Sequence, residues 1–225
     1  MIWADLIPLV IATIYVVVVF IISEKVLNTK PEVARKFLHI MIGNMIFIMP
    51  FFSDVWGMLI LTVPTTIVLF FLTDYSPIKI ENKVTESGHV LGLFFYALIW
   101  SVLLLIFNGD NLWIVAMAIA ALVYGDGFAA LIGSKFGRVK YTIWGGEKSL
   151  EGSITMFVVV AVVSVFVWMF YAALPYHYSL PTFNFWAILG ISAIATVCEA
   201  VSYGGIDNIT VPGLTAILYY VLSIL

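Results

Sequence analysis

The chain has 225 residues, of which 63% are hydrophobic and only 10% are charged, and its formal net charge is −3. A soluble domain is about half apolar and about a quarter charged, so this composition indicates an integral membrane protein. The single cysteine, Cys198, excludes an intrachain disulfide and a metal site built from several cysteines. The few cations lie in short loops, and nothing in the sequence indicates binding to nucleic acid.

Eight apolar stretches approach the ~20 residues that a membrane-spanning helix needs. In chain order they are Leu6–Ile22, Phe37–Phe52, Val55–Leu72, Gly88–Phe107, Leu112–Ile132, Ile154–Leu174, Phe183–Val201 and Thr210–Leu225. The second is short and the last runs to the end of the sequence, so a count of seven stays open. The first lacks the signature of a cleaved signal peptide. We predict one all-α domain over residues 1–225, a polytopic bundle of seven or eight transmembrane helices.

The ten Lys and Arg residues predict how these spans are oriented. All ten lie in the connections after the first, third and fifth spans: Lys25, Lys30, Arg35, Lys36; Lys79, Lys83; Lys135, Arg138, Lys140, Lys148. Cytoplasmic loops of membrane proteins are enriched in Lys and Arg, so we place these three connections in the cytoplasm and both termini outside. The compact chain favours the plasma membrane of a prokaryote.

Asp126 is the exceptional residue of the fifth span. It stands between Gly125 and Gly127 in a run that is otherwise apolar. A charged group at the centre of a span costs about 3 kcal/mol on insertion scales, so Asp126 is a candidate functional residue. The flanking glycines predict a loosened helix with backbone groups that face a cavity.

A stripe of small residues runs along the same span and beyond it. Its members recur at every fourth position: Ala121, Gly125, Ala129, Gly133 and Gly137. Such a stripe lets a second helix approach closely. We predict that it serves packing, and we assign it no chemistry.

The loop 134–153, which follows this span, is dense in Lys, Gly and Ser. It is not a Walker A motif, because Glu147 separates Gly146 from Lys148. Backbone N–H groups of its glycines can still bind an anion while lysine adds positive charge. The candidate phosphate-binding residues here are Lys135, Arg138, Lys148, Ser149 and Gly152. Lys140 lies in the same loop, but the general enrichment of cytoplasmic loops in cations explains its presence as well as phosphate binding does.

Further candidate residues lie on the same predicted side of the membrane. Glu199 stands near the end of the seventh span, and Asp207 and Asn208 follow in a turn. Mg²⁺ prefers oxygen ligands such as carboxylates, so Asp126, Glu199 and Asp207 are candidate ligands. Helix capping is the alternative for Asp207 and Asn208. At the start of the second span, Arg35 and His39 are four residues apart and share a helix face, so both can reach one anion.

Three segments resemble the polyprenol kinase family of dolichol kinases, phytol kinases and CTP-dependent diacylglycerol kinases. They are GDGFAALIGSKFGR (125–138), EKSLEGS (147–153) and EAVSYGGIDNITVP (199–212), and RKFLHI (35–40) and ESGH (86–89) fit the same family. The resemblance covers nearly the whole chain. It implies phosphoryl transfer, usually from CTP, to the hydroxyl of a membrane lipid alcohol. Phytol, geranylgeraniol, dolichol-like polyprenols and diacylglycerol all stay open.

Under this hypothesis, each candidate residue receives a role. Catalytic roles are predicted for Asp126, Glu199, Lys148 and Glu151, the last as a group that orients the backbone or a lysine, or as a general base. Asp126 and Glu199 would bind Mg²⁺, with Asp207 and Asn208 completing the metal or nucleotide shell. The triphosphate of CTP would be held by Lys135, Arg138 and Lys148, with Ser149 and Gly152, and from the second span by Arg35 and His39.

Two other functions stay open on the sequence alone. The segments around Asp126 are also similar to phosphatidate cytidylyltransferases, although Leu150 stands where Trp is usual in both families. The chain lacks the C-terminal signature of the cytidylyltransferases, which favours the kinase. A small ion-coupled transporter, with Asp126 and Glu199 as an ion relay, is the alternative from another class. The sequence does not fix the oligomeric state, and a homodimer stays open.

Overall fold

The computed structural model describes residues 2–26, 31–73, 75–77, 90–144 and 146–225, and within them the side chains of all residues except 2–3, 24–26, 31–35 and 90. The chain is mostly helical, as predicted. The helices are α1 (Ile2–Val26), α2 (Pro31–Gly43), α3 (Val55–Phe71), α5 (Val90–Ile106), α6 (Leu112–Ala120), α7 (Gly127–Phe136), α8 (Leu150–Ala173), α9 (Phe185–Val201) and α10 (Asp207–Ile224). Short 3₁₀ turns extend α2 at Asn44–Phe47 and Met49–Phe51 and precede α6 at Gly109–Asn111.

Helix lengths support a membrane protein. Among the described residues, three helical stretches are long and apolar enough to cross a membrane: Ala4–Ser23, Gly109–Phe136 and Leu150–Ala173. Four apolar helices are shorter: Lys36–Phe51, Val55–Phe71, Leu91–Ile106 and Phe185–Val201. A helix of 17 residues is about 25 Å long, less than the ~30 Å of a bilayer core. The count of seven or eight spans therefore stays a prediction.

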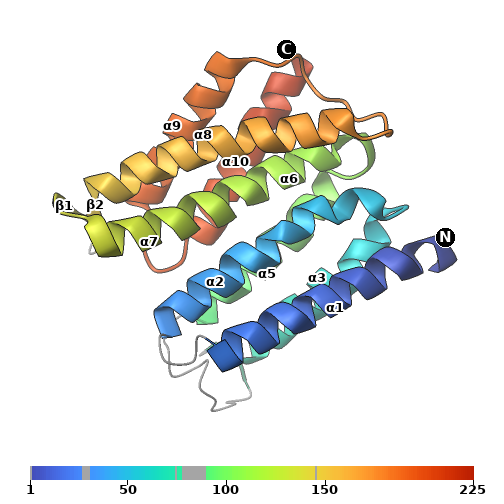
Figure 1. Ribbon diagram of the computed structural model, residues 1–225, viewed down its shortest axis with the longest axis horizontal. Coiled ribbons are helices and arrows are strands. Elements are labelled where there is room, and N and C mark those ends of the chain that lie inside the picture. The colour runs from blue at the N-terminus through green and yellow to red at the C-terminus, as the bar shows by residue number, and fades with distance from the viewer. Residues whose placement is uncertain (1, 27–30, 74, 78–89, 145) are drawn as a thin grey trace.

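The helix α6 is the centre of the bundle. All its residues from Leu112 to Ala120 are buried, which an all-apolar helix requires. It packs against α8 and α10, while α2 packs against its C-terminal continuation into α7. Figure 1 shows α6 and α7 as one continuous rod between α8 and α2, with α1 and α3 along the outer edge.

The junction between α6 and α7 is a π-helical turn, Ala121–Asp126. Such turns are rare and often occur at functional sites. The predicted irregularity around Asp126 is therefore confirmed. Gly127, the next residue, lets α2 come close, because a Cβ added there would lie 2.6 Å from Cγ1 of Ile40. The end of the central helix thus meets the face of α2 that carries His39.

The small-residue stripe packs against α8, as predicted. A Cβ added at Gly125 would lie 2.5 Å from Sδ of Met156, and one added at Gly133 would lie 2.9 Å from Oγ of Ser149. Both distances are shorter than ordinary Cβ contacts, so a side chain at either position would force its neighbours on α8 and its cap to shift. The close approach brings the N-terminal turn of α8 against α7.

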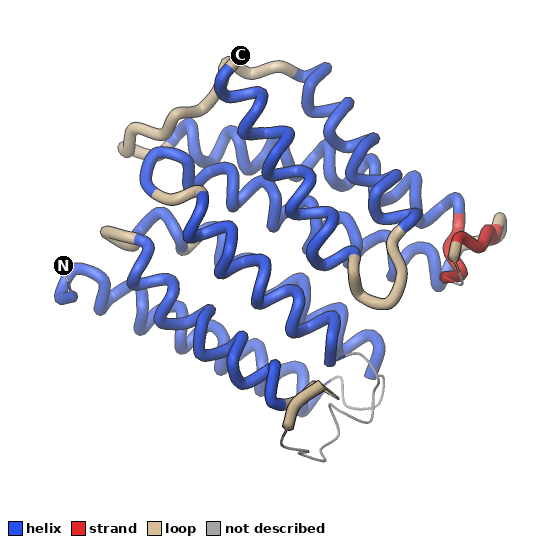
Figure 2. Tube along the Cα trace, turned by 180° about the vertical axis from the view of Figure 1, so that it is seen from behind, coloured by secondary structure: helices blue, strands red, loops and turns tan. Residues whose placement is uncertain are grey.

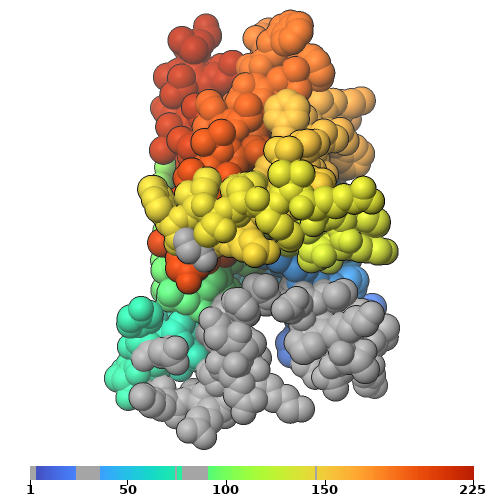
Figure 3. All heavy atoms as spheres, turned by 90° about the vertical axis from the view of Figure 1, so that its left-hand side faces the viewer, coloured from blue at the N-terminus to red at the C-terminus, as the bar shows by residue number. Residues whose placement is uncertain are grey.

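The segment predicted as a loop after α7 contains an antiparallel hairpin, a small addition to the all-α architecture. Its strands are β1 (Lys140–Ile143) and β2 (Gly146–Ser149), with Tyr141 opposite Lys148. The Ser149 hydroxyl then caps α8 by accepting a hydrogen bond from the N–H of Gly152 at 3.1 Å. Figure 3 shows the hairpin, in yellow, lying across one end of the bundle.

The two ends of the chain lie at the other end of the bundle. Figure 2 shows the N- and C-terminal helix ends on the side away from the hairpin. The predicted topology requires this arrangement, since it places both termini on the side opposite the basic loop. Lys30, Lys79 and Lys83, which also entered that prediction, lie outside the described residues.

Substitution at Gly43 tests the close contact between α2 and the central helix. A Cβ added there would lie 2.8 Å from Cβ of Val123, a stiff β-branched residue. We expect Gly43→Ala to destabilise the protein by about 1–3 kcal/mol through overpacking, measured as a lower melting temperature of the detergent-solubilised protein.

Gly190→Ala in α9 is the matched control, because an added Cβ would meet no described atom within 4 Å. We expect no loss, or a gain of up to about 1 kcal/mol from helix propensity. Equal melting temperatures for the two variants would contradict the close contact.

Candidate active site

A cavity of about 750 Å³ opens at the hairpin end of the bundle. Its described lining comes from α2, α7, the hairpin and the first turn of α8, from the end of α9 to the start of α10, and from the segment after α3 and the start of α5. Of the candidate residues from the sequence, it collects His39, Asp126, Lys148, Ser149, Gly152, Glu199, Asp207 and Asn208. These residues span most of the chain length, so the fold brings separate segments to one site.

Asp126 stands on the wall of this cavity and is only 7% exposed. Its Oδ2 lies 2.5 Å from Nζ of Lys36, which α2 supplies. Nε2 of His39, one turn further along α2, lies 3.9 Å from the same oxygen. The predicted acid therefore has a cationic partner on a neighbouring helix.

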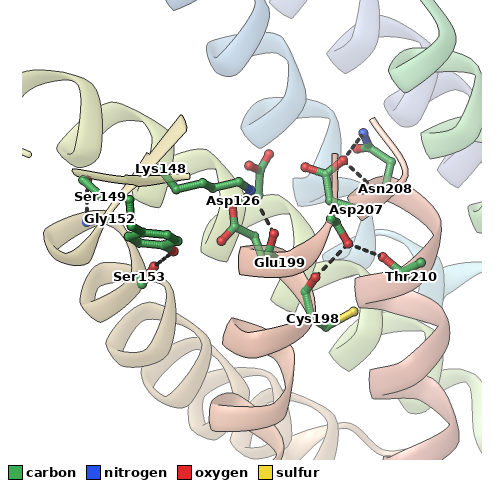
Figure 4. A network of polar contacts seen from close by, with 12 residues as sticks. Asp126, Lys148, Ser149, Gly152, Ser153, Cys198, Glu199, Asp207, Asn208 and Thr210 are labelled. Atoms are coloured by element: carbon green, nitrogen blue, oxygen red, sulfur yellow. Dashed lines mark hydrogen bonds and ion pairs between the residues drawn. The ribbon is translucent and has the colours of Figure 1, made fainter. Parts of the chain in front are cut away.

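Glu199 makes the second ion pair of the cavity. The ammonium group of Lys148 contacts Oε1 of Glu199 and also donates to its backbone carbonyl at 2.9 Å. Glu199 is 5% exposed and belongs to α9, whereas Lys148 belongs to β2. Figure 4 shows the lysine reaching from the hairpin to Glu199, with Asp126 beside them. The pair therefore connects the hairpin to the helix bundle.

Asp207 and Asn208 are the first two residues of α10 and follow a turn at residues 204–206. The turn is made possible by Gly204 and Gly205, whose φ angles are +68° and +87°. Asn208 donates to Oδ1 of Asp207 from its backbone N–H at 3.0 Å, and from its side chain to the Gly205 carbonyl at 3.1 Å. Burial and the nearby charge of Asp126 raise the pKa of the Asp207 carboxyl. Both residues thus combine local turn bonds with a place on the cavity wall.

Three of the candidate residues lie outside this cavity. Lys135 and Arg138 are exposed, and the ammonium group of Lys135 lies 5.2 Å from the ring centre of Phe136. Glu151 accepts hydrogen bonds from the backbone N–H groups of Arg138, at 3.0 Å, and Val139, at 3.3 Å. Glu151 therefore orients the backbone before the hairpin, one of the roles considered for it.

Two other candidate features cannot be placed in the site. The side chain of Arg35 lies outside the described residues, although its backbone belongs to α2. The stretch 86–89, which contributed to the family resemblance, also lies outside them.

Comparison with known proteins identifies the family. The chain is 33% identical over 192 residues to a phytol kinase of Synechocystis sp., covering 80% of this chain and 75% of the relative. The chain belongs to the phytol kinase family. It is 30% identical over 145 residues to phytol kinase 1, chloroplastic, of Arabidopsis thaliana, covering 62% of this chain and 47% of that protein. No family model and no solved structure matches the chain.

A third relative extends the family to another plant. The chain is 26% identical over 159 residues to a probable chloroplastic phytol kinase of Triticum aestivum, covering 66% of this chain and 51% of the relative. The chain thus spans about half the length of both plant proteins. The resemblance to the polyprenol kinases that the sequence motifs indicated is confirmed.

Lys36 lines the cavity, but the sequence analysis assigned it no role in the site. It lies in the RKFLHI segment, where only Arg35 and His39 received roles. A signal was present, because Lys36 and His39 are three residues apart and share a helix face. Lys140, for which two explanations stayed open, also lines the cavity and lies 3.6 Å from Glu147. Among the residues that the structure describes, the cavity wall thus has three lysines, from α2 and the hairpin.

The chemistry of the cavity fits a hard divalent cation. Among the described residues, three carboxylates line it besides the exposed Glu147, those of Asp126, Glu199 and Asp207, and carboxylate oxygens are the protein ligands that Mg²⁺ prefers. Within the described residues, no three Asp, Glu, His or Cys side chains are placed to hold a metal ion together. Asp126 and Glu199 contact lysines instead. The donor atoms of a metal site are thus present and paired with ammonium groups.

Removing one partner of the Lys148–Glu199 pair tests how strongly it anchors the hairpin. Only 20% of the Lys148 side chain and 7% of the Glu199 side chain are exposed. Lys148→Met would leave a buried carboxylate without its partner, at a cost of about 3–5 kcal/mol. We expect a marked drop in the thermal unfolding temperature of the solubilised protein.

Lys140→Met provides the matched control for this measurement. Lys140 also pairs with a glutamate, but 44% of its side chain and 68% of that of Glu147 are exposed. An exposed pair contributes less than about 1 kcal/mol. A drop of the same size in both variants would show that burial of the Lys148–Glu199 pair is not what matters.

Proposed function

We propose that the protein is a CTP-dependent lipid alcohol kinase that transfers the γ-phosphate of CTP to the hydroxyl of a membrane isoprenoid alcohol. The names of its relatives favour phytol within the group that includes geranylgeraniol and the polyprenols. The reaction would require Mg²⁺ and take place at the cytoplasmic face of the membrane, which we take to be the plasma membrane of a prokaryote.

The observation that carries this proposal is the position of the charged cavity in a member of this family. A cavity of about 750 Å³ lies within the usual range for small-molecule sites. It opens at the hairpin end of helices that are otherwise apolar, so a polar nucleotide from the cytoplasm and the hydroxyl end of a lipid can meet there. A relay for ions does not need lysines from two separate elements on one cavity wall.

The residues of the cavity suit phosphoryl transfer. This reaction asks the protein mainly for positioning and for neutralisation of charge on the phosphates. Lys36, Lys140 and Lys148 supply positive charge, and Asp126, Glu199 and Asp207 are the residues that would hold Mg²⁺. When bound, the metal neutralises charge on the transferring phosphate. Lys135 and Arg138 are exposed outside the cavity lining and would attract the nucleotide by their charge.

The proposed transfer forms one bond to the γ-phosphorus and breaks another. The alcohol oxygen forms a bond to the γ-phosphorus, and the bond from that phosphorus to the bridging oxygen of CDP breaks. The products are a lipid monophosphate and CDP, and the hydroxyl proton is released. The lipid chain needs only apolar surface, which the helices around the cavity supply.

A direct assay distinguishes this reaction from the cytidylyltransferase alternative. Purified protein is incubated with Mg²⁺, CTP labelled at the γ-phosphate, and separate samples of phytol, geranylgeraniol, a polyprenol and diacylglycerol. We expect label in an isoprenoid monophosphate. Label only in a CDP-lipid, obtained with α-labelled CTP and phosphatidate, would replace the kinase with the cytidylyltransferase. Label only in phosphatidate, from diacylglycerol, would keep the kinase and correct the substrate class.

Asp126→Asn tests the catalytic importance of the buried acid. The change removes a charge without changing the volume of the side chain. Loss of one preorganised charge-stabilising group lowers the rate by about two to three orders of magnitude, and we expect at least this loss of lipid phosphorylation at saturating CTP and Mg²⁺.

Asp110→Asn is the matched control, because Asp110 is exposed in the turn before α6, at the opposite end of the central rod. This variant should phosphorylate lipid at the wild-type rate. Wild-type activity of Asp126→Asn would remove Asp126 from the proposed site.

A further inference from the structure

Two buried carboxylates of the cavity are each held by a lysine from a different part of the chain. Lys36 of α2 holds Asp126 at 2.5 Å, and Lys148 of β2 holds Glu199. All four side chains line the same cavity. The side chains of both pairs are at most 20% exposed, so both ion pairs are largely buried.

This arrangement is unfavourable for a divalent cation that enters alone. To bind both carboxylates, the metal must displace both ammonium groups, and each would then be a buried charge without a partner. Breaking a buried pair in this way is strongly unfavourable. Repulsion between the metal and the two lysines adds to the cost.

A metal that enters together with a nucleotide meets a different situation. The phosphate oxygens offer each displaced ammonium group a new anion in the same cavity. Lysine suits this exchange, because its ammonium group is a compact charge on a flexible four-carbon stem. Asp207, the third carboxylate, accepts hydrogen bonds from Asn208 rather than from a lysine in the described contacts, so it needs no such exchange.

We propose that Lys36 and Lys148 are exchangeable counter-ions. They hold Asp126 and Glu199 in the nucleotide-free protein and move to phosphate oxygens when the nucleotide binds. The metal site therefore forms fully only with the nucleotide present, and the protein binds a free divalent cation there only weakly. The inference rests on the proposed nucleotide-dependent function and assigns a positioning role to Lys36.

Binding of Mn²⁺, a paramagnetic substitute for Mg²⁺, tests the proposal without measuring turnover. Free Mn²⁺ is followed by electron paramagnetic resonance while it is titrated into the purified protein without nucleotide. We expect wild-type protein to bind Mn²⁺ weakly, and the double variant Lys36→Met/Lys148→Met to bind it at least about tenfold more tightly, since the competing ammonium groups are gone. Adding Asp126→Asn to the double variant should abolish the gain.

Lys140→Met is the matched control for loss of positive charge. Lys140 lines the same cavity but pairs with the exposed Glu147 rather than with Asp126 or Glu199. It should leave Mn²⁺ affinity close to that of the wild type. The same gain in Lys140→Met as in the double variant would overturn the proposal, because any loss of positive charge would then suffice.

A measurement on wild-type protein covers the case in which the double variant fails to fold. The melting temperature is recorded with Mn²⁺ alone, with CTP and a chelator, and with Mn²⁺ and CTP together. We expect Mn²⁺ alone to give no shift, and both together to give more than the sum of the separate shifts. A shift with Mn²⁺ alone equal to that with both ligands would overturn the proposal.

Failure of this inference is distinguishable from failure of the proposed function. Lipid phosphorylation by a protein that binds Mn²⁺ tightly without nucleotide would keep the kinase and remove the counter-ion exchange. The expected Mn²⁺ results in a protein that phosphorylates no lipid would keep the exchange and refute the kinase.

Discussion

The Lys36–Asp126 ion pair is the contact on which the arrangement of the site depends. Asp126 ends the most buried helical segment of the bundle, and a carboxylate there remains charged only with a cation beside it. The cation comes from α2, which must therefore lie close to the π-helical turn. Gly43 and Gly127 remove the side chains that would keep the two helices apart. Close packing at these two glycines thus brings Lys36 within reach of Asp126.

The other wall of the cavity depends on how the hairpin is held. Ser149 caps α8, and Glu151 binds the backbone that enters β1. Because these bonds fix both ends of the hairpin, they direct Lys148 to Glu199. Ser149, a phosphate-binding candidate in the sequence, and Glu151, a catalytic candidate, thus fix the frame of the cavity, and Lys148 next to Ser149 reaches into it. The same segment supplies both the support and the charge.

The sequence was sufficient to predict the features that depend on local pattern. Long apolar stretches predicted helices, the glycine spacing predicted the close approach of another helix, and isolated acids in apolar surroundings singled out Asp126 and Glu199, which line one cavity. It could not predict the pairing of Lys36 with Asp126, because the two residues are 90 positions apart and only the packing of α2 brings them together. Nor could it separate Lys148 from Lys135 and Arg138, since the direction of each side chain follows from the hairpin and the end of α7.

The polar side chains of the cavity suit the nucleotide side of the proposed reaction better than the lipid side. Lysines and carboxylates recognise phosphate and metal, whereas an isoprenoid chain offers them only one hydroxyl group. Selection among alcohols must then come from apolar surfaces around the cavity. Such surfaces distinguish substrates by only about 1–3 kcal/mol per methylene group. The charged cavity is therefore compatible with different alcohols, because a change of alcohol would alter the contacts with the apolar helices and not those with the lysine–carboxylate pairs.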